Sequence, residues 1–164
     1  MSQSTNLCGT VHTLPTSNDT DWGAALAAFL AAVPTKLGPS VLHFGSGTTP
    51  ADTADNFLRP GFEAAAADTT EIYFRVPLAG KMSKLYVQAT TAPGTSGQVI
   101  TVRKEAADTA LTATLAAAGT QAADTTHSFT VAAGDRIAVK VKGVAGISAG
   151  AVNLVVSMLY SADA

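Results

Sequence analysis

From residue 41 onward, the sequence alternates apolar and polar residues, and no helical pattern interrupts the alternation. A period of two places successive side chains on opposite faces of a strand, so these segments predict half-buried strands. The clearest segment alternates Ile72, Phe74, Val76 and Leu78 with Glu71, Tyr73, Arg75 and Pro77. Further strands are predicted at residues 41–44, 85–89, 98–104, 110–115, 128–131, 136–142 and 152–160, with Gly- and Pro-containing turns between them.

The number and order of these segments predict the fold class. Parallel strands need crossover connections, usually helices, and no helical pattern separates these strands. About eight strands joined by turns favour an antiparallel sandwich, and a jelly roll is the natural form for that number. We therefore expect a mainly β protein, with a jelly-roll β-sandwich over residues 38–164. Residues 45–63 are expected to form a long loop with a short strand at residues 56–59.

Residues 1–18 have a different character. They are polar, lack periodicity and include Pro15, which predicts an extended N-terminal arm or a disordered tail. Leu7, Val11 and Leu14 are apolar residues spaced along it. Because the arm has no core of its own to join, we expect it to become ordered on a partner.

Residues 19–37 carry the helical pattern of the chain. Trp22, Leu26, Phe29 and Val33 recur at helical spacing between a capping Asp19 or Thr20 and Pro34, while alanines occupy the opposite face. Charged residues make up only 13% of the chain, so a solvated alanine face is not expected. The pattern favours an oligomerisation neck in which Trp22, Leu26, Phe29 and Val33 pack between chains. Alternatives are docking on the chain's own sandwich, or a helix bound to a membrane surface or a peptide groove.

Charge and hydropathy argue against several partners. The net charge of -2 gives no basic field for binding nucleic acid. No apolar run approaches the roughly 20 residues that cross a bilayer, and the N-terminus lacks the pattern of a secretory signal. Cys8 is the single cysteine, so no disulfide within one chain is expected. We expect a chain that is kept soluble inside a cell.

The motifs of common enzymes are absent from the sequence, so we expect no catalytic activity and no cofactor or metal. His12, His43 and His127 lie in separate segments, where a surface or strand position is the ordinary interpretation, although a threefold axis could bring three copies of one histidine together. Gly134-Asp135 is typical of a tight structural turn.

Residues 76–143 resemble the trimeric jelly-roll domains of phage structural proteins, and more distantly the heads of tumour necrosis factor-like and spore-surface glycoproteins. Four features carry the resemblance, in this order along the chain. They are a Pro-x-x-Gly step at Pro77 and Gly80, a strand with Leu85 and Val87, a strand-turn-strand unit at residues 99–115, and a Val-x-x-Gly-Asp-x-Ile step at Val131, Gly134, Asp135 and Ile137. The segment Thr20-Asp21-Trp22-Gly23 with Leu26 resembles short helices that precede such heads. Related hairpins often have Asn-Gly where this chain has residues 105–108, so a longer turn is expected there.

The resemblance implies a homotrimeric virion protein that is assembled in the host cytoplasm. Its expected role is capsid decoration on the outer capsid surface, with Leu7, Val11 and Leu14 of the arm binding the major capsid protein. The alternative is the tip of a head or tail fibre whose outer loops bind a receptor or cell-surface glycan. Decoration is favoured because an arm and a short helix precede the sandwich where an adhesin carries a long shaft, and because the aromatic residues that stack on sugars are scarce.

Overall fold

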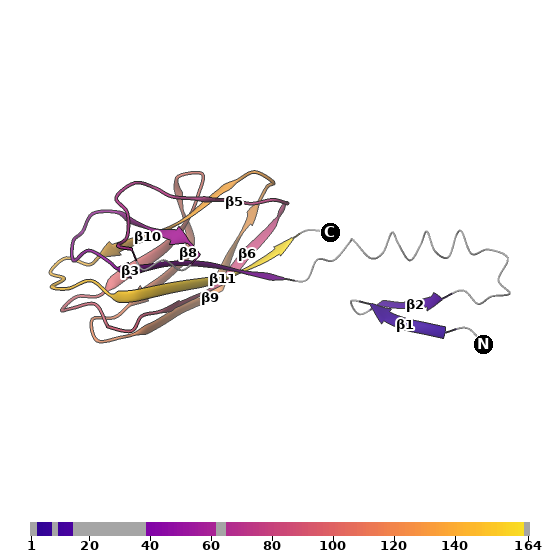
Figure 1. Ribbon diagram of the computed structural model, residues 1–164, viewed down its shortest axis with the longest axis horizontal. Coiled ribbons are helices and arrows are strands. Elements are labelled where there is room, and N and C mark those ends of the chain that lie inside the picture. Colours follow the sequence, from indigo (N-terminus) through magenta and orange to yellow (C-terminus); the bar gives the residue numbers. More distant parts are fainter. Residues whose placement is uncertain (1–2, 8–9, 15–38, 62–64, 163–164) are drawn as a thin grey trace. The chain divides into compact units, whose positions relative to one another are not determined.

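The dominant feature of the fold is a nine-stranded sheet, seen in a computed structural model that describes residues 3–7, 10–14, 39–61 and 65–162 (Figure 1). The chain divides into two units, one of residues 1–38 with 162–164 and one of residues 39–161. The strands of the large sheet are β3 (Ser40–Thr48), β4 (Asn56–Pro60), β5 (Phe74–Arg75), β6 (Gly80–Gln88), β7 (Gln98–Lys104), β8 (Ala107–Leu115), β9 (Gln121–Val131), β10 (Arg136–Gly143) and β11 (Val152–Ala162).

The sheet consists of two four-stranded rows. Strand order along the sheet is β8-β7-β10-β4-β3-β11-β6-β9, and β5 pairs with β10 outside this path. The first row is β3-β11-β6-β9, and the second row is β4-β10-β7-β8. The two rows join through two residue pairs between β3 and β4. At the other end the sheet nearly closes, because the Thr112 amide of β8 donates to the Asp124 carboxylate of β9 at 3.1 Å. The expectation of a mainly β, antiparallel fold is confirmed.

The hydrophobic core lies between the rows. Strand β6 shows why: Gly80, Met82, Leu85 and Val87 are buried, while the residues between them are exposed or, at Ser83, half-buried. A register irregularity between Ser83 and Leu85 shifts the alternation by one residue. Fully buried side chains come from both rows, and they include Phe44, Met82, Leu85, Leu154 and Met158 from the first and Leu58, Ile100, Leu111, Leu115 and Ile137 from the second. Alternation along the strands therefore sets which side chains enter the core.

One predicted strand is much shorter than expected. Of residues 71–78, only Phe74 and Arg75 form a strand, and Leu78 is 45% exposed. Beyond them, the amide of Val76 donates to the Asp135 carbonyl, and the Val76 carbonyl accepts from the Gly134 amide. These bonds tie the segment to a turn, and Pro77, which has no N–H, cannot continue a ladder.

The turn at residues 105–106 corrects a second expectation. Strand β7 ends at Lys104 and β8 begins at Ala107, so the connection has two residues and is not the longer turn expected. Glu105 has a φ of 48° and Ala106 a φ of 63°. Positive φ at both central residues is the geometry of a tight type I′ hairpin turn, which usually selects Asn-Gly. Glu105 is held there by Arg136, whose backbone N–H donates to Oε1 at 2.6 Å and whose Nε donates to Oε2 at 3.0 Å.

The loops at the end of the sandwich remote from Ser40 are fastened by buried polar groups. The hydroxyl of Thr49 donates to Gln98 Oε1 at 2.9 Å, and the amide of Ala151 donates to the same oxygen at 3.1 Å. A Cβ on Gly150 would lie 1.6 Å from the carbonyl oxygen of Thr49, so only glycine permits this close approach. These contacts fix the loops on which β3, β7 and β11 depend.

The N-terminal segment contains a β-hairpin. β1 (Gln3–Leu7) and β2 (Thr10–Leu14) pair antiparallel, from Gln3 opposite Leu14 to Leu7 opposite Thr10. In the sequence, two residues ending in Gly9 connect the strands, a turn signal that the expectation of a single extended arm left out. The predicted helix at residues 19–37 lies outside the described residues.

Candidate functional site: a charge-poor sheet face

The residues singled out in the sequence fall in different parts of the chain. In the hairpin, Leu7 pairs with Thr10, Val11 with Asn6 and Leu14 with Gln3. The predicted neck residues Trp22, Leu26, Phe29 and Val33 lie outside the described residues. The chain forms two units, so the N-terminal residues and the residues of the sandwich are described separately.

Gly134 and Asp135 form a turn between β9 and β10. Gly134 has a φ of 91°, in the left-handed region that favours glycine. The Ala132 amide donates to Asp135 Oδ2 at 2.7 Å, and Lys104 Nζ lies 2.9 Å from the same oxygen. First the Ala132 amide and then the Lys104 ammonium lower the pKa of the Asp135 carboxyl. These contacts are those of a structural turn.

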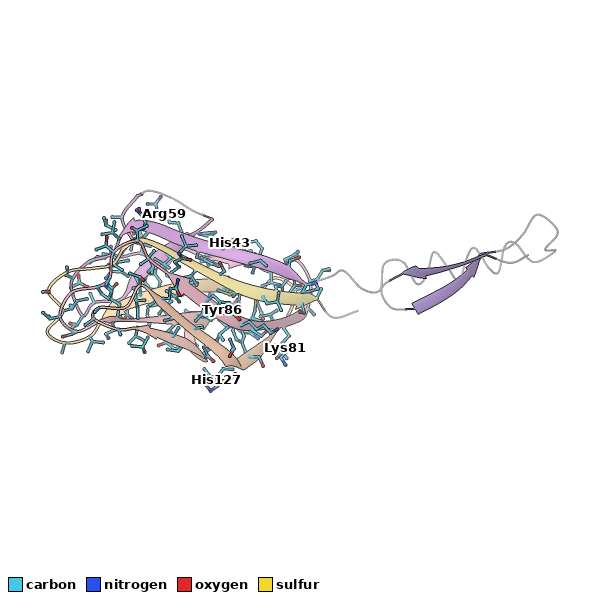
Figure 2. All side chains as sticks on the ribbon, turned by 90° about the horizontal axis from the view of Figure 1, so that it is seen from below. His43, Arg59, Lys81, Tyr86 and His127 are labelled. Atoms are coloured by element: carbon cyan, nitrogen blue, oxygen red, sulfur yellow. The ribbon has the colours of Figure 1, made fainter. Side chains whose placement is uncertain are left out.

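The outer surface of the first row is nearly free of charge, and we call it the charge-poor face: the outward side of β3, β11, β6 and β9. Strands β3 and β11 have no Asp, Glu, Lys or Arg, and β6 and β9 have only Lys81, Lys84 and Asp124. In Figure 2, His43 on β3, Tyr86 on β6 and His127 on β9 mark its width. Its exposed side chains are mostly aliphatic, aromatic, hydroxyl or amide groups.

The outer surface of the second row is the opposite in character. Lys140 of β10, with only 11% of its side chain exposed, pairs with Asp108 and lies 3.8 Å from Asp55. Arg103 of β7 lies 3.0 Å from Asp108 and 3.4 Å from Glu71, and its guanidinium stands 5.5 Å from the ring of Phe57. This face is therefore covered by the chain's own ionic network, whereas the charge-poor face has no such cover among the described residues.

Toward Ser40, the charge-poor face becomes apolar. Val41 is 53% exposed and Tyr86 is 52% exposed. Val41 lies opposite Leu159 in the β3–β11 ladder, and both residues line a shallow hollow with Lys84 and Tyr86. Two places along β3, His43 contacts the Ser157 hydroxyl through Nδ1 at 3.0 Å. Large apolar side chains exposed together in a soluble domain typically mark a contact surface.

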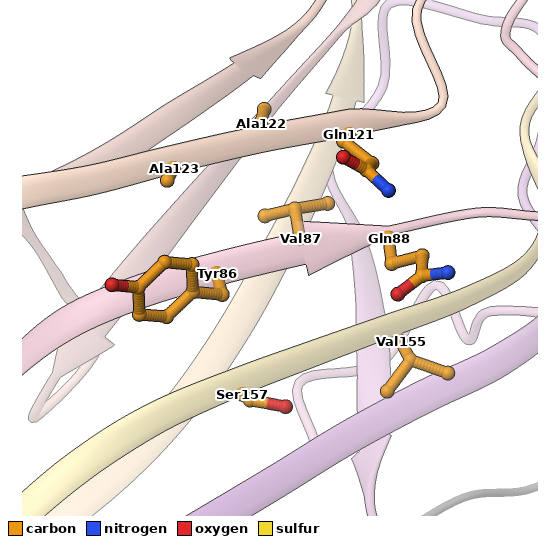
Figure 3. Close-up of a pocket in the computed structure, with 8 residues that line it drawn as sticks. All are labelled: Tyr86, Val87, Gln88, Gln121, Ala122, Ala123, Val155 and Ser157. Carbon is orange, nitrogen blue, oxygen red and sulfur yellow. The ribbon is translucent and has the colours of Figure 1, made fainter.

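Away from Ser40, the same face contains a groove of about 520 Å³ that is lined by both apolar and polar side chains (Figure 3). Its walls come from β6, β9 and β11, and its lining includes Tyr86, Gln88, Gln121, Ala123 and Ser157. Gln88 lies opposite Gln121 in the β6–β9 ladder, and Tyr86 lies opposite Ala123. The two amides therefore stand side by side, and alanine leaves the tyrosine ring uncovered.

Asp124 and His127 form a close contact at the edge of this face. The carboxylate of Asp124 lies 2.8 Å from His127 Nδ1 and accepts hydrogen bonds from the amides of Thr112, Thr126 and His127. Burial opposes ionisation of this carboxyl, but the hydrogen bonds from His127, Thr112 and Thr126 outweigh burial and hold its pKa well below the usual range. The Thr126 hydroxyl lies 3.3 Å from the same ring nitrogen, His127 Nδ1, and donates to Asp124 Oδ1 at 3.0 Å.

The described residues give no grouping of His, Cys, Asp and Glu that could hold a metal ion. Nor does that part of the chain contain a helix long and apolar enough for a bilayer span. His43 and His127 lie on different strands of the charge-poor face.

The charge-poor face was not identified from the sequence. Its signal was present, because the outward positions of β11 are Val155, Ser157 and Leu159, where a solvated strand usually carries charge. A face without charge can be recognised only when it is known which strands are neighbours in the sheet, and the sequence pattern does not give that order. Comparison with known proteins gives no match to a family model and no match to a curated protein.

Proposed function

We propose that this protein is a non-enzymatic capsid decoration protein: a homotrimer that binds the outer capsid surface of a phage through its N-terminal residues 1–37. The observation that carries the proposal is the unequal distribution of charge between the two faces of the sandwich. One face is covered by its own ion pairs, and the other exposes Val41 and Tyr86 with almost no charge. Copies of the chain that pack on the end of this face nearest Ser40 would remove Val41 and Leu159 from water and leave the groove beside Tyr86 open.

We also infer that the sandwich is a jelly roll. In support, every connection between successive strands of the two rows leads from one row to the other, except the hairpin β7–β8. Strands β6 and β9, which pair along most of their length, are separated in the sequence by β7 and β8 of the opposite row. Pairing of distant strands around an inserted hairpin is the connectivity of folded-over Greek keys. The number three for the assembly comes from the resemblance to trimeric phage domains.

The N-terminal hairpin supports an attachment role. A two-stranded hairpin alone is at best marginally stable in water, and β1 and β2 pair only with each other among the described residues. Residues 3–14 include no charged residue that would protect an exposed strand edge. Such a segment gains stability by pairing with a partner, here the major capsid protein, and three copies on one trimer would bind with high effective concentration.

The first test addresses self-association. Native mass spectrometry of the full chain at micromolar concentration should give a trimer. Val41→Asp should raise the dissociation constant by about a hundredfold or more, because each contact would bury an unpaired carboxylate. Val144→Asp is the matched control: Val144 is 38% exposed in the loop between β10 and β11, away from this face, and its variant should remain a trimer. A monomeric wild-type protein would overturn the proposal.

The second test addresses attachment. Capsids assembled without this protein should co-sediment with the full chain and should not co-sediment with a variant that lacks residues 1–15. The truncated variant should still form trimers through the neck and the charge-poor face. Equal binding of the two proteins would show that the hairpin is not the attachment segment.

The second candidate function is a receptor- or glycan-binding tip of a head or tail fibre. One observation favours it, the groove between Tyr86, Gln88 and Gln121, which combines an exposed aromatic ring with two side-chain amides. Binding of the full chain to host cells, without binding to capsids, would favour this function over decoration.

A further inference from the structure

We propose that the groove between β6, β9 and β11 is a binding site for a neutral polysaccharide. The site consists of the Tyr86 ring as a stacking platform, the Gln88 and Gln121 amides as hydrogen-bonding groups, and the Ser157 hydroxyl on the opposite wall. Figure 3 shows the two amides on the same side of the tyrosine. The proposal gives a ligand class to the second candidate function and rests on it, whereas it does not depend on the decoration function, because binding of a sugar here requires no capsid.

The tyrosine supplies the apolar part of the site. Tyr86 is 52% exposed, and its cross-strand neighbour Ala123 is too short to cover the ring. The other neighbours in the groove, Val155 and Ser157, add a low wall that leaves the ring accessible. An exposed aromatic ring beside a shallow groove can stack on the C–H face of a sugar, which combines an apolar face with a polar rim.

The two glutamines supply the polar part. Gln88 and Gln121 lie directly opposite each other, and each primary amide has two N–H donors and a carbonyl acceptor. Neither side chain has a hydrogen-bond partner within the described part of the chain, so both amides are available to a ligand. Gln88 follows Tyr86 by two residues on the same strand, about 7 Å along it, so one ligand can reach the ring and the amides together.

The charges around the groove define the ligand class. No Asp, Glu, Lys or Arg lines it, which disfavours a phosphate, a carboxylate or a cation as the recognised group. A polysaccharide without charge is polar enough for the amides and apolar enough for the ring. The groove also continues into a second hollow lined by Gln88, Thr90, Asn153 and Val155, so the track is longer than one side chain and suits an extended chain.

The groove and the apolar end of the face are separable. Val41 and Leu159 line the apolar hollow and do not line the groove, whereas Gln88 and Gln121 line the groove and not that hollow. Tyr86 lines both, so sugar binding by a Tyr86 variant is compared with that of the wild type only at the same oligomeric state, checked by native mass spectrometry. A variant of the two glutamines therefore tests sugar binding without touching the apolar surface assigned to self-association.

The test is affinity electrophoresis of the full chain in native gels that contain dextran, laminarin, galactomannan or xylan, with alginate as the acidic comparison. We expect retardation by at least one neutral polysaccharide. Tyr86→Ala should weaken that binding about tenfold or more. The double variant Gln88→Ala/Gln121→Ala should weaken polysaccharide binding at least about threefold, while native mass spectrometry shows the same oligomeric state as the wild type.

The matched control is Tyr73→Ala, because Tyr73 is also an exposed tyrosine, at 41%, but lies outside the groove. This variant should bind like the wild type, and melting temperatures should show that every variant is folded. Lack of retardation by all four neutral polysaccharides would overturn the proposal, as would equal binding by the glutamine variant. Preferential retardation by alginate that is lost in Lys84→Ala would overturn the neutral ligand class. None of these results changes the expected effect of Val41→Asp, so failure of this site and failure of the self-association proposal remain distinguishable.

Discussion

At the scale of single residues, Asp124 shows how one carboxylate closes a sheet. Its oxygens join the two end strands by accepting from Thr112 of β8 and from Thr126 and His127 of its own strand. Only 6% of the side chain is exposed, so these hydrogen bonds act away from water. Because they favour the ionised form, the pKa of the folded carboxyl is lowered, and the ionised carboxylate contributes stability to the fold.

This contribution has a defined pH dependence. We expect Asp124→Asn to lower the free energy of unfolding by about 1–3 kcal/mol at neutral pH. The wild-type advantage is present above the unfolded-state pKa of about 3.9 and is lost as the pH falls from there toward the lowered folded-state pKa. Urea unfolding at stepped pH values measures the difference, with Thr125→Asn as a control at the adjacent exposed position. A wild-type advantage that does not change with pH would contradict this account.

At the scale of elements, the hairpin turn between β7 and β8 places two residues that have a Cβ in a backbone conformation that favours glycine. Ala106 has a φ of 63°, a conformation that costs a residue with a Cβ roughly 1–2 kcal/mol. Ala106→Gly should therefore raise the free energy of unfolding by about 1 kcal/mol, reduced from the full strain because glycine also gains freedom in the unfolded chain. Ala110→Gly, within β8, should instead lower it, and thermal or urea unfolding compares the two variants. A destabilised Ala106→Gly protein would show that this turn is not strained.

The same turn shows where prediction from sequence stops. The strands were predicted well where alternation is regular, as at residues 98–104, which match β7. A turn was expected at residues 105–108, but Glu105 and Ala106 gave no signal of a tight two-residue turn, since their conformation is imposed by the register of β7 with β8 and by Arg136 from the neighbouring strand. The groove could not be predicted from the sequence either, because Gln88 of β6 and Gln121 of β9 become neighbours only when these two strands pair, and β7 and β8 lie between them in the sequence. Local pattern sets the strands, and pairing of distant strands builds the site.

At the scale of the whole sandwich, the two faces differ in which interactions can act on them. The outer face of the second row holds Lys140 and Arg103 in ion pairs with Asp108. On the charge-poor face, Val41 and Leu159 line the apolar hollow, so the association proposed there would be driven by burial of apolar surface. Salt screens exposed charges, with a Debye length of about 10 Å at 0.1 M and about 3 Å at 1 M, but it does not weaken apolar burial.

The assembly should therefore respond to ions in a characteristic way. We expect the trimer dissociation constant to stay nearly constant between about 0.05 M and about 1 M sodium chloride, where contacts between exposed charges would be progressively screened. Ammonium sulfate should lower the dissociation constant, because sulfate is excluded from the protein surface and strengthens apolar burial. Sedimentation velocity over a range of protein concentrations measures both effects. Dissociation by sodium chloride would instead place the contact among charged groups, such as those of the second row, and would remove the charge-poor face from the interface.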